Sequence, residues 1–133
     1  MISGLGLDLV KVSRVEQALA RFGQRFLARC FTAAESEAAF KRPNPAQALA
    51  MRFAAKEAFA KATGQGFKGL ALTEIEVAHE PSGRPFLKLH GRARTWAENE
   101  GVGGCHLSLS DDGEYAMAVV ALERREEAGG NVV

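Results

Sequence analysis

Two carboxylates and a lysine interrupt segments of this chain that are otherwise apolar, and they are the groups best placed to do chemistry. Asp8 lies within the mostly apolar segment 2–10, which has the composition of a strand, although Asp is disfavoured in strands. Glu57 and Lys61 fall on the apolar stripe of a helix expected at 46–62. A buried carboxylate needs a partner, which could be the lysine one turn on or a metal ion with a phosphate beside it. An ordinary i,i+4 ion pair, worth about 0.3 kcal/mol, is the structural alternative.

Regular secondary structure is expected around these groups. Nearly every residue from 46 to 62 is a strong helix former, with no Gly or Pro, so a long helix is predicted there. The Thr32-Ala33-Ala34-Glu35 pattern is typical of a capping box and predicts a short helix that ends near Phe40. Further helices are predicted from about Ser13 and at 90–100, and strands at 2–10, 74–79, 85–89, 104–110 and 115–122. Together they predict an α+β fold, with an antiparallel sheet packed on the long central helix.

Two motifs resemble those of the 4'-phosphopantetheinyl transferases, specifically the short holo-(acyl-carrier-protein) synthase type. Gly6-Leu7-Asp8-Leu9-Val10 fits the pattern Gly-x-Asp-x-Val, and Phe53-Ala54-Ala55-Lys56-Glu57-Ala58-Phe59-Ala60-Lys61 fits Phe-x-x-Lys-Glu-Ala-x-x-Lys. The resemblance covers residues 1–123 and implies one phosphopantetheinyl transferase-like domain there, followed by a polar C-terminal tail at 124–133.

The resemblance implies transfer of the 4'-phosphopantetheine arm of coenzyme A to a serine of apo acyl-carrier protein in fatty-acid biosynthesis, with release of 3',5'-ADP. Asp8 and Glu57 would hold Mg²⁺, because hard carboxylate oxygens together with phosphate oxygens and waters suit that ion. Lys61 would neutralise the pyrophosphate as charge develops on the leaving group. The general base stays open between a water held by the metal, Glu57 and Lys61.

Further residues are candidates for binding coenzyme A. Basic side chains that could meet the 3'-phosphate and pyrophosphate oxygens are Lys41, Arg42, Arg52, Lys56 and Lys61. Gly64 and Gly66 could let a phosphate or the pantetheine arm approach the backbone, although a plain helix-ending loop is the alternative. His106 and Ser108 lie on the polar face of a predicted strand, and the resemblance assigns them to the coenzyme A cleft. Related chains often have a His where Asp111 stands, so the resemblance assigns Asp111 no role.

The basic residues are concentrated in the first half of the chain. Residues 1–68 carry a net charge of +6 and residues 69–133 a net charge of −5. This asymmetry favours a surface that docks an acidic partner, although a solvated basic face would have the same composition. The resemblance implies that the first helix binds an acidic helix of the carrier protein. The expected carrier-binding residues are Arg14, Arg21, Phe22, Arg25 and Arg29.

Composition and sequence patterns argue against several other classes of protein. The chain has 133 residues, enough for one domain with its own core, and its two cysteines, Cys30 and Cys105, are too few for a disulfide framework or a zinc cluster. It has no signal-peptide pattern, no apolar run long enough to span a membrane and no nucleic-acid-binding motif. We therefore expect a cytoplasmic protein without membrane or nucleic-acid partners. The resemblance further implies a homotrimer with active sites between subunits.

Two other functions fit part of the pattern. A non-catalytic module could dock an acidic protein through the Arg14 to Arg29 surface without using Asp8 or Glu57. A metal-dependent phosphohydrolase could use the same two carboxylates, and it would hydrolyse coenzyme A with no carrier present.

Overall fold

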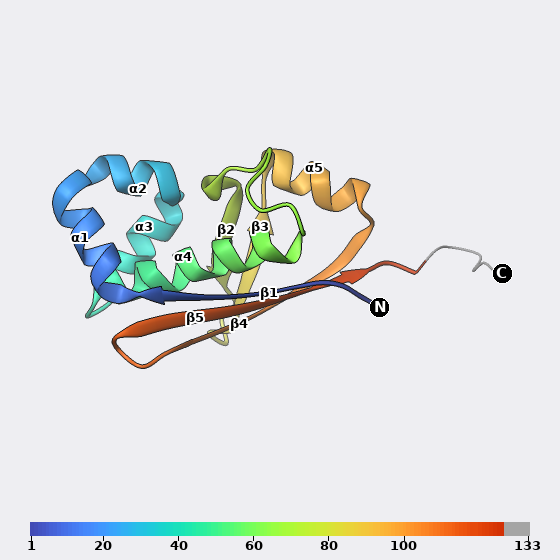
Figure 1. The fold of residues 1–133 in the computed structure, drawn as a ribbon. Coiled ribbons are helices and arrows are strands. Elements are labelled where there is room, and N and C mark those ends of the chain that lie inside the picture. The colour runs from blue at the N-terminus through green and yellow to red at the C-terminus, as the bar shows by residue number, and fades with distance from the viewer. Residues whose placement is uncertain (127–133) are drawn as a thin grey trace.

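The fold is built around one long helix that lies across a three-stranded sheet. The structure is a computed structural model that describes residues 1–126. In chain order, its elements are β1 (Ile2–Lys11), α1 (Val12–Phe22), α2 (Gln24–Cys30), α3 (Ala33–Phe40), α4 (Pro45–Ala62), the short 3-10 helix η1 (Leu72–Glu74), β2 (Ile75–His79), β3 (Pro85–Leu89), α5 (Gly91–Asn99), β4 (Val102–Asp111) and β5 (Tyr115–Arg124). In Figure 1, α4 runs along the three long strands, and the remaining helices cover the side of α4 away from them.

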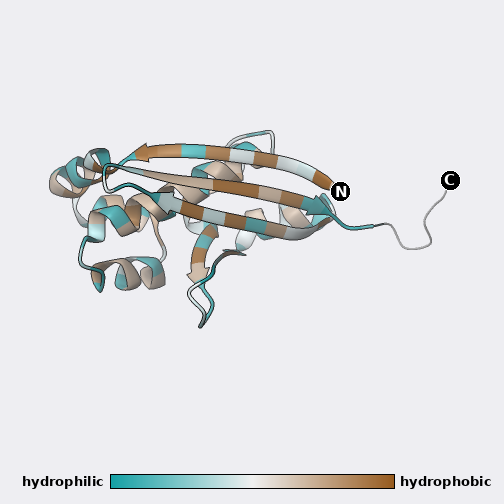
Figure 2. Ribbon diagram, turned by 90° about the horizontal axis from the view of Figure 1, so that it is seen from below, coloured by the Kyte–Doolittle hydropathy of each residue, from teal (hydrophilic) through white to brown (hydrophobic). Residues whose placement is uncertain are grey.

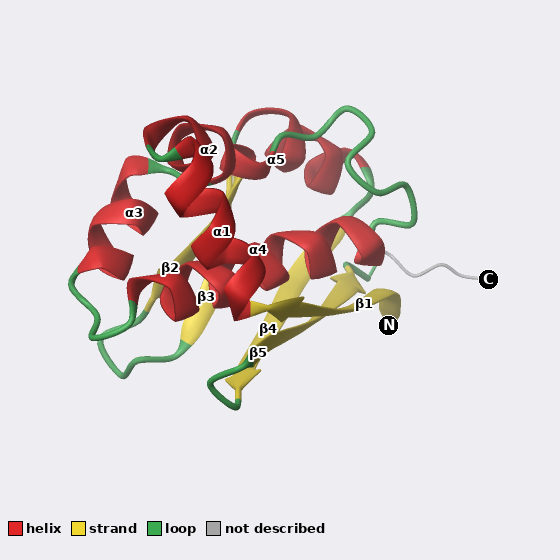
Figure 3. Ribbon diagram, turned by 60° about the vertical axis from the view of Figure 1, so that its left-hand side comes forward, coloured by secondary structure: helices red, strands yellow, loops and turns green. Residues whose placement is uncertain are grey.

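The strands form two antiparallel sheets, so the single five-stranded sheet expected from the sequence is wrong. The larger sheet has the order β1-β5-β4, and β2 pairs only with β3. The β2–β3 hairpin runs across the direction of the three long strands (Figures 1 and 3), so β3 cannot extend the ladder of β4 although the two lie close together. The expected α+β class with antiparallel strands packed on a central helix is confirmed.

Local signals in the sequence account for most helix ends. Thr32 and Glu35 form the predicted capping box, since the Thr32 hydroxyl accepts from the Glu35 N–H at 3.2 Å and the Thr32 N–H donates to Glu35 Oε1 at 3.0 Å. Asn44 caps α4, which begins at Pro45. The helix α2 was not predicted, because Gly23, with a φ of 52°, separates it from α1 by a single residue.

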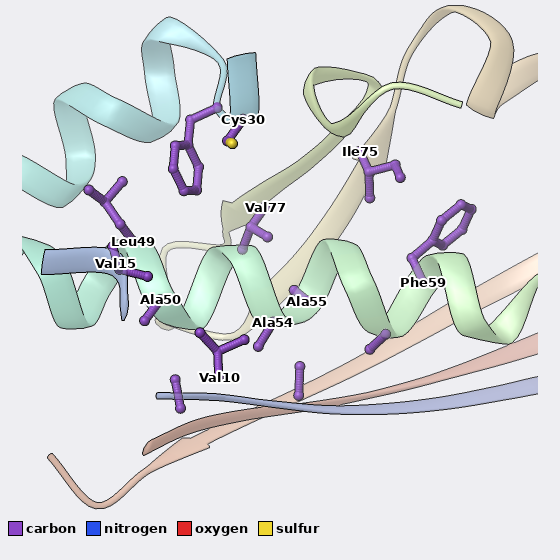
Figure 4. Packing of buried hydrophobic residues seen from close by; sticks show 14 of the residues in the cluster. Val10, Val15, Cys30, Leu49, Ala50, Ala54, Ala55, Phe59, Ile75 and Val77 are labelled. Atoms are coloured by element: carbon purple, nitrogen blue, oxygen red, sulfur yellow. The ribbon is translucent and has the colours of Figure 1, made fainter. Parts of the chain in front are cut away.

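The helix α4 is buried on nearly all sides, which corrects the expected one-sided apolar stripe. Figure 4 shows Ala50 and Ala54 directed toward the sheet, where Val10 lies, while Phe59 and Ile75 lie on the other side of the helix. The Phe59 ring packs edge-to-face on Trp96 of α5, with ring centroids 6.1 Å apart. None of the helices in residues 1–126 combines the length and the apolar character that crossing a membrane requires.

The C-terminal strand continues beyond the expected domain end. β5 reaches Arg124, and the Arg125 N–H donates to the Gly101 carbonyl at 2.7 Å. The first residues of the expected tail at 124–133 thus belong to the domain, and residues 127–133 lie outside the described part of the chain.

The strand β1 touches the backbone of α4 directly. A Cβ atom placed on Gly6 would lie 1.9 Å from the Ala58 carbonyl oxygen, and one on Gly4 would lie 2.1 Å from the Ala62 carbonyl oxygen. Backbone atoms cannot move aside as a flexible side chain can, so any larger residue at these positions must push the strand away from the helix.

We therefore predict that Gly6→Ala lowers the free energy of unfolding by about 3 kcal/mol, the upper end of ordinary overpacking, because the strand must shift. Urea unfolding followed by circular dichroism measures this change. The matched control is Gly103→Ala in β4, where a Cβ would mainly meet the side chain of Arg125. Equal stability of Gly6→Ala and wild type would show that β1 and α4 are not in close backbone contact.

Candidate active site

Asp8 and Glu57 line one cleft between β1 and α4. Alternation along β1 exposes Leu5, Leu7 and Leu9 and turns Asp8 toward the helix. The cleft has a volume of about 430 Å³, and residues that line it include Asp8, Arg14, Phe26, Phe53 and Glu57. The structure thus brings the two carboxylates singled out in the sequence to one place, although they lie 49 positions apart.

Lys61 pairs with Asp8 rather than with Glu57. Its ammonium donates to Asp8 Oδ1 at 2.8 Å and to the Leu7 carbonyl oxygen at 3.1 Å. The hydrogen bond to Asp8 and the charge of that carboxylate raise the pKa of Lys61, so the amine stays protonated at neutral pH. The lysine side chain is 55% exposed, which corrects its expected place on a buried stripe. It can therefore reach a ligand that enters the cleft.

The environment of the Glu57 carboxylate favours the binding of a cation beside it. Burial raises the pKa of Glu57, and the charge of Asp8 raises it further, while Lys61 opposes this effect. Two carboxylates thus share one partly buried cleft, with the Lys61 ammonium beside them and Arg14 among the lining residues. Among residues 1–126, no third His, Cys, Asp or Glu joins them in a cluster that could hold a metal. Two hard oxygen donors and space for waters and phosphate oxygens fit Mg²⁺.

A second, cationic pocket lies between the start of α4, β2 and the end of β4. It has a volume of about 240 Å³, and residues that line it include Arg42, Gln47, Arg52, His79 and Asp111. Arg52 is only 6% exposed, and its Nη1 donates to the Ala48 carbonyl oxygen at 3.0 Å. Its Nε is buried without a partner. A buried guanidinium that lines a pocket is suited to an anion such as phosphate.

The pocket also contains a histidine and a carboxylate. Burial lowers the pKa of His79, and the charges of Arg52 and Arg42 lower it further, so an anion in the pocket would favour the charged imidazole. Asp111 is held by a hydrogen bond from the Gln47 side-chain amide. Sequence reasoning did not single out His79, although alternation along β2 places it on the same face as the buried Ile75 and Val77.

The Lys56 ammonium is enclosed in the protein interior, which corrects its assignment to coenzyme A binding. The residue is 0% exposed. Its ammonium donates to Glu35 Oε1 at 2.7 Å, to the Ile75 carbonyl oxygen at 2.6 Å and to the Leu72 carbonyl oxygen at 3.0 Å. All three protons of the ammonium are therefore used inside the protein.

Other residues expected to bind coenzyme A lie apart from both pockets. Lys41 is exposed and pairs with Glu37 at 3.6 Å, and it does not line the cationic pocket. Gly64 and Gly66 follow α4 in a loop and have φ values of 80° and 65°, which favour glycine. His106 and Ser108 lie on the face of the sheet turned away from α4, where the His106 ring contacts the Glu123 carboxylate. Within one chain, the structure does not bring these four residues and Lys41 to either pocket.

The basic surface of α1 and α2 contains a shallow apolar groove. Residues that line it include Ala18, Phe22, Arg25, Phe26 and Arg29, around a volume of about 260 Å³. The guanidinium carbons of Arg21 and Arg25 lie 5.2 Å and 5.7 Å from the centre of the Phe22 ring. Phe26 lines both this groove and the cleft of Asp8 and Glu57, so the two surfaces are continuous.

Comparison with known proteins agrees with the resemblance seen in the sequence. The family model of the 4'-phosphopantetheinyl transferase superfamily matches residues 4–120. A holo-[acyl-carrier-protein] synthase of Trichlorobacter lovleyi is 48% identical and one of Alkalilimnicola ehrlichii 47% identical, each alignment covering 92% of this chain and 98% of the relative.

Solved structures agree as well. The crystal structure of holo-[acyl-carrier-protein] synthase from Neisseria meningitidis has a TM-score of 0.88 at 36% identity, with 93% of this chain and 100% of that chain covered. The Helicobacter pylori synthase in complex with coenzyme A has a TM-score of 0.79 at 27% identity, with 90% and 99% covered. The chain therefore belongs to the holo-[acyl-carrier-protein] synthase family of 4'-phosphopantetheinyl transferase enzymes.

Proposed function

We propose that this enzyme transfers the 4'-phosphopantetheine group of coenzyme A to a serine of apo acyl-carrier protein, with Mg²⁺, in fatty-acid biosynthesis. The observation that carries the proposal is the shared cleft of Asp8 and Glu57, with Lys61 held on Asp8. The relatives named as holo-[acyl-carrier-protein] synthases, and the Helicobacter pylori structure with coenzyme A, support the carrier and the donor.

Each cleft residue has a role in this reaction. The serine oxygen bonds to the β-phosphorus of coenzyme A, the bond from that phosphorus to the bridging oxygen breaks, and 3',5'-ADP leaves. Asp8 and Glu57 would hold Mg²⁺, which when bound supplies positive charge to the pyrophosphate. Lys61 adds a second positive charge for the leaving phosphate, and Asp8 orients it. The serine proton passes to a water or to Glu57, because the Lys61 amine is already protonated and cannot accept it.

Replacing either carboxylate by its amide tests the cleft. We expect Asp8→Asn and Glu57→Gln each to lower turnover by about 100-fold or more, because each removes one ligand charge. The assay incubates coenzyme A, Mg²⁺ and apo carrier, and mass spectrometry detects the phosphopantetheine added to the carrier.

The Glu57→Gln variant also has an expected effect on stability. Burial and the charge of Asp8 destabilise the ionised form of Glu57 in the folded protein. Without metal, Glu57→Gln should therefore melt at or above the wild-type temperature near pH 7.

Two controls accompany this assay. A reaction without carrier should leave coenzyme A intact, since a phosphohydrolase would consume it. Full wild-type activity in EDTA would contradict the metal assignment.

The cationic pocket is the proposed site of the coenzyme A 3'-phosphate. We expect Arg52→Met to raise KM for coenzyme A by about 10- to 100-fold, the value of one charge-assisted hydrogen bond. KM for dephospho-coenzyme A, which lacks this phosphate, should change much less. The matched control is Arg94→Met on the exposed face of α5. Equal losses with the two donors would place the 3'-phosphate elsewhere.

We further propose a homotrimer with active sites between subunits. The cationic pocket and the cleft of Asp8 and Glu57 lie on different sides of α4 and share no lining residue. A neighbouring subunit is therefore needed to bring the cationic pocket of one chain to the cleft of another. Apolar and polar residues alternate along β1 (Figure 2), and apolar side chains suited to such contact are exposed on the sheet, with Leu5 67% exposed and Met117 40% exposed. We expect wild-type protein to scatter light as a trimer and Leu5→Glu to be monomeric and inactive. A monomeric, active wild type would contradict this arrangement.

The groove of α1 and α2 is the proposed docking site for an acidic helix of the carrier. Arg25 and Arg29 line this groove, and reversing both to Glu should raise KM for the carrier by about 10-fold or more, at roughly 1 kcal/mol per contact. Coenzyme A binding should stay nearly unchanged, and the wild-type KM for the carrier should rise with salt. The control reverses Arg84 and Arg94, which lie outside the groove. An unaltered carrier KM in the double reversal would mean that the carrier docks elsewhere.

A further inference from the structure

A fully buried ion pair joins Lys56, the residue before Glu57 on α4, to Glu35 of α3. Lys56 is 0% exposed and Glu35 is 1% exposed, and Lys56 Nζ lies 2.7 Å from Glu35 Oε1. Both groups are satisfied. The lysine also donates to the carbonyl oxygens of Leu72 and Ile75, and the two Glu35 oxygens accept from the Thr32 and Val77 backbone N–H groups. The pair therefore joins α4 to the start of α3 and to the η1–β2 segment.

A buried ion pair does not by itself indicate that the pair stabilises the folded protein. The cost of desolvating two buried charges commonly cancels their attraction, and replacing both by uncharged side chains of similar size is often neutral for stability. Burial lowers the pKa of Lys56, which reflects this cost, while Glu35 opposes the shift. The directional hydrogen bonds of the pair, in contrast, fix where α4 lies against its neighbours.

The position of Lys56 on the helix makes this fixation relevant to the reaction. Successive residues of an α-helix differ by about 100° around its axis. Ala58 and Ala62 are the residues at which β1 touches the backbone of α4, and they lie roughly opposite Lys56. Glu57 therefore projects from the part of the helix between two anchors, the backbone contact with β1 and the hydrogen bonds of Lys56.

We propose that the Lys56–Glu35 pair is a positioning device that fixes the rotation of α4 and so holds the Glu57 carboxylate at the distance from Asp8 that a divalent cation needs. This inference rests on the proposed metal role of Asp8 and Glu57. Lys56 and Glu35 touch neither substrate nor metal, and they are positioning residues rather than catalytic ones.

The test removes both charges at once. Lys56→Met/Glu35→Gln keeps the side-chain lengths, leaves no unpaired buried charge and should melt within a few degrees of wild type. We expect its turnover to fall about 10-fold or more, and its affinity for Mn²⁺ to weaken by a similar factor, as for other residues that orient metal ligands. Electron paramagnetic resonance at saturating coenzyme A measures Mn²⁺ binding, corrected for coenzyme A alone. The matched control is Lys88→Met/Glu37→Gln, with the same chemical changes at exposed positions.

The outcomes separate positioning from simple structure. A folded double variant with wild-type Mn²⁺ affinity and turnover would overturn the proposal, because a merely structural pair does not affect metal binding in a folded protein. If the double variant does not fold, Glu35→Asp decides, since it keeps both charges paired but moves the carboxylate away from Lys56 by one methylene. It should then weaken Mn²⁺ binding measurably, and wild-type affinity would overturn the proposal. If wild-type enzyme itself neither binds Mn²⁺ nor modifies the carrier, the proposed function fails instead.

Discussion

The contact between the backbones of β1 and α4 is the constraint on which the rest of the structure depends. Gly4 and Gly6 are spaced by about 6.6 Å along a strand, and Ala58 and Ala62 by about 6 Å along a helix. Two successive glycines of β1 can thus meet two successive turns of α4, which the close approaches at both positions reflect. The next inward residue of the strand is Asp8, which the same spacing brings beside the preceding turn of the helix.

This geometry also explains why Lys61 reaches Asp8. Long side chains of a helix lean toward its N-terminus, so the Lys61 ammonium lies over the turn that contains Glu57. Since β1 and α4 run in opposite directions along their contact, Asp8 lies at that turn. The two hydrogen bonds of Lys61 to β1 then hold the amine beside the cleft. A close-packed, apolar contact thereby determines the arrangement of the charged groups Asp8, Glu57 and Lys61.

Much of this arrangement could be predicted from the sequence, because its signals are local. The capping box at Thr32, the lack of helix breakers in α4 and the carboxylates that interrupt apolar segments all lie within short windows. The sequence could not show which cations are buried. α4 is covered on nearly all sides, so its periodicity does not distinguish the Glu57 side from the Lys56 side. The partner of Lys56, Glu35, lies 21 residues away on another helix. The cationic pocket likewise includes His79. Its proximity to Arg52 depends on how β2 packs against α4, which the sequence does not show.

The three basic residues of α4 differ in burial and in hydrogen bonding, and therefore in whether they can bind a ligand. Lys56 is fully satisfied inside the protein, Lys61 is paired but exposed, and Arg52 is buried with one unused donor. Only the last two have capacity left for a ligand, and they lie on different sides of the helix. A coenzyme A molecule that uses both kinds of site must therefore lie between two subunits in the proposed trimer. Each α4 would then serve two active sites, its Glu57 side one and its Arg52 side another, so any rotation of the helix would disturb both at once.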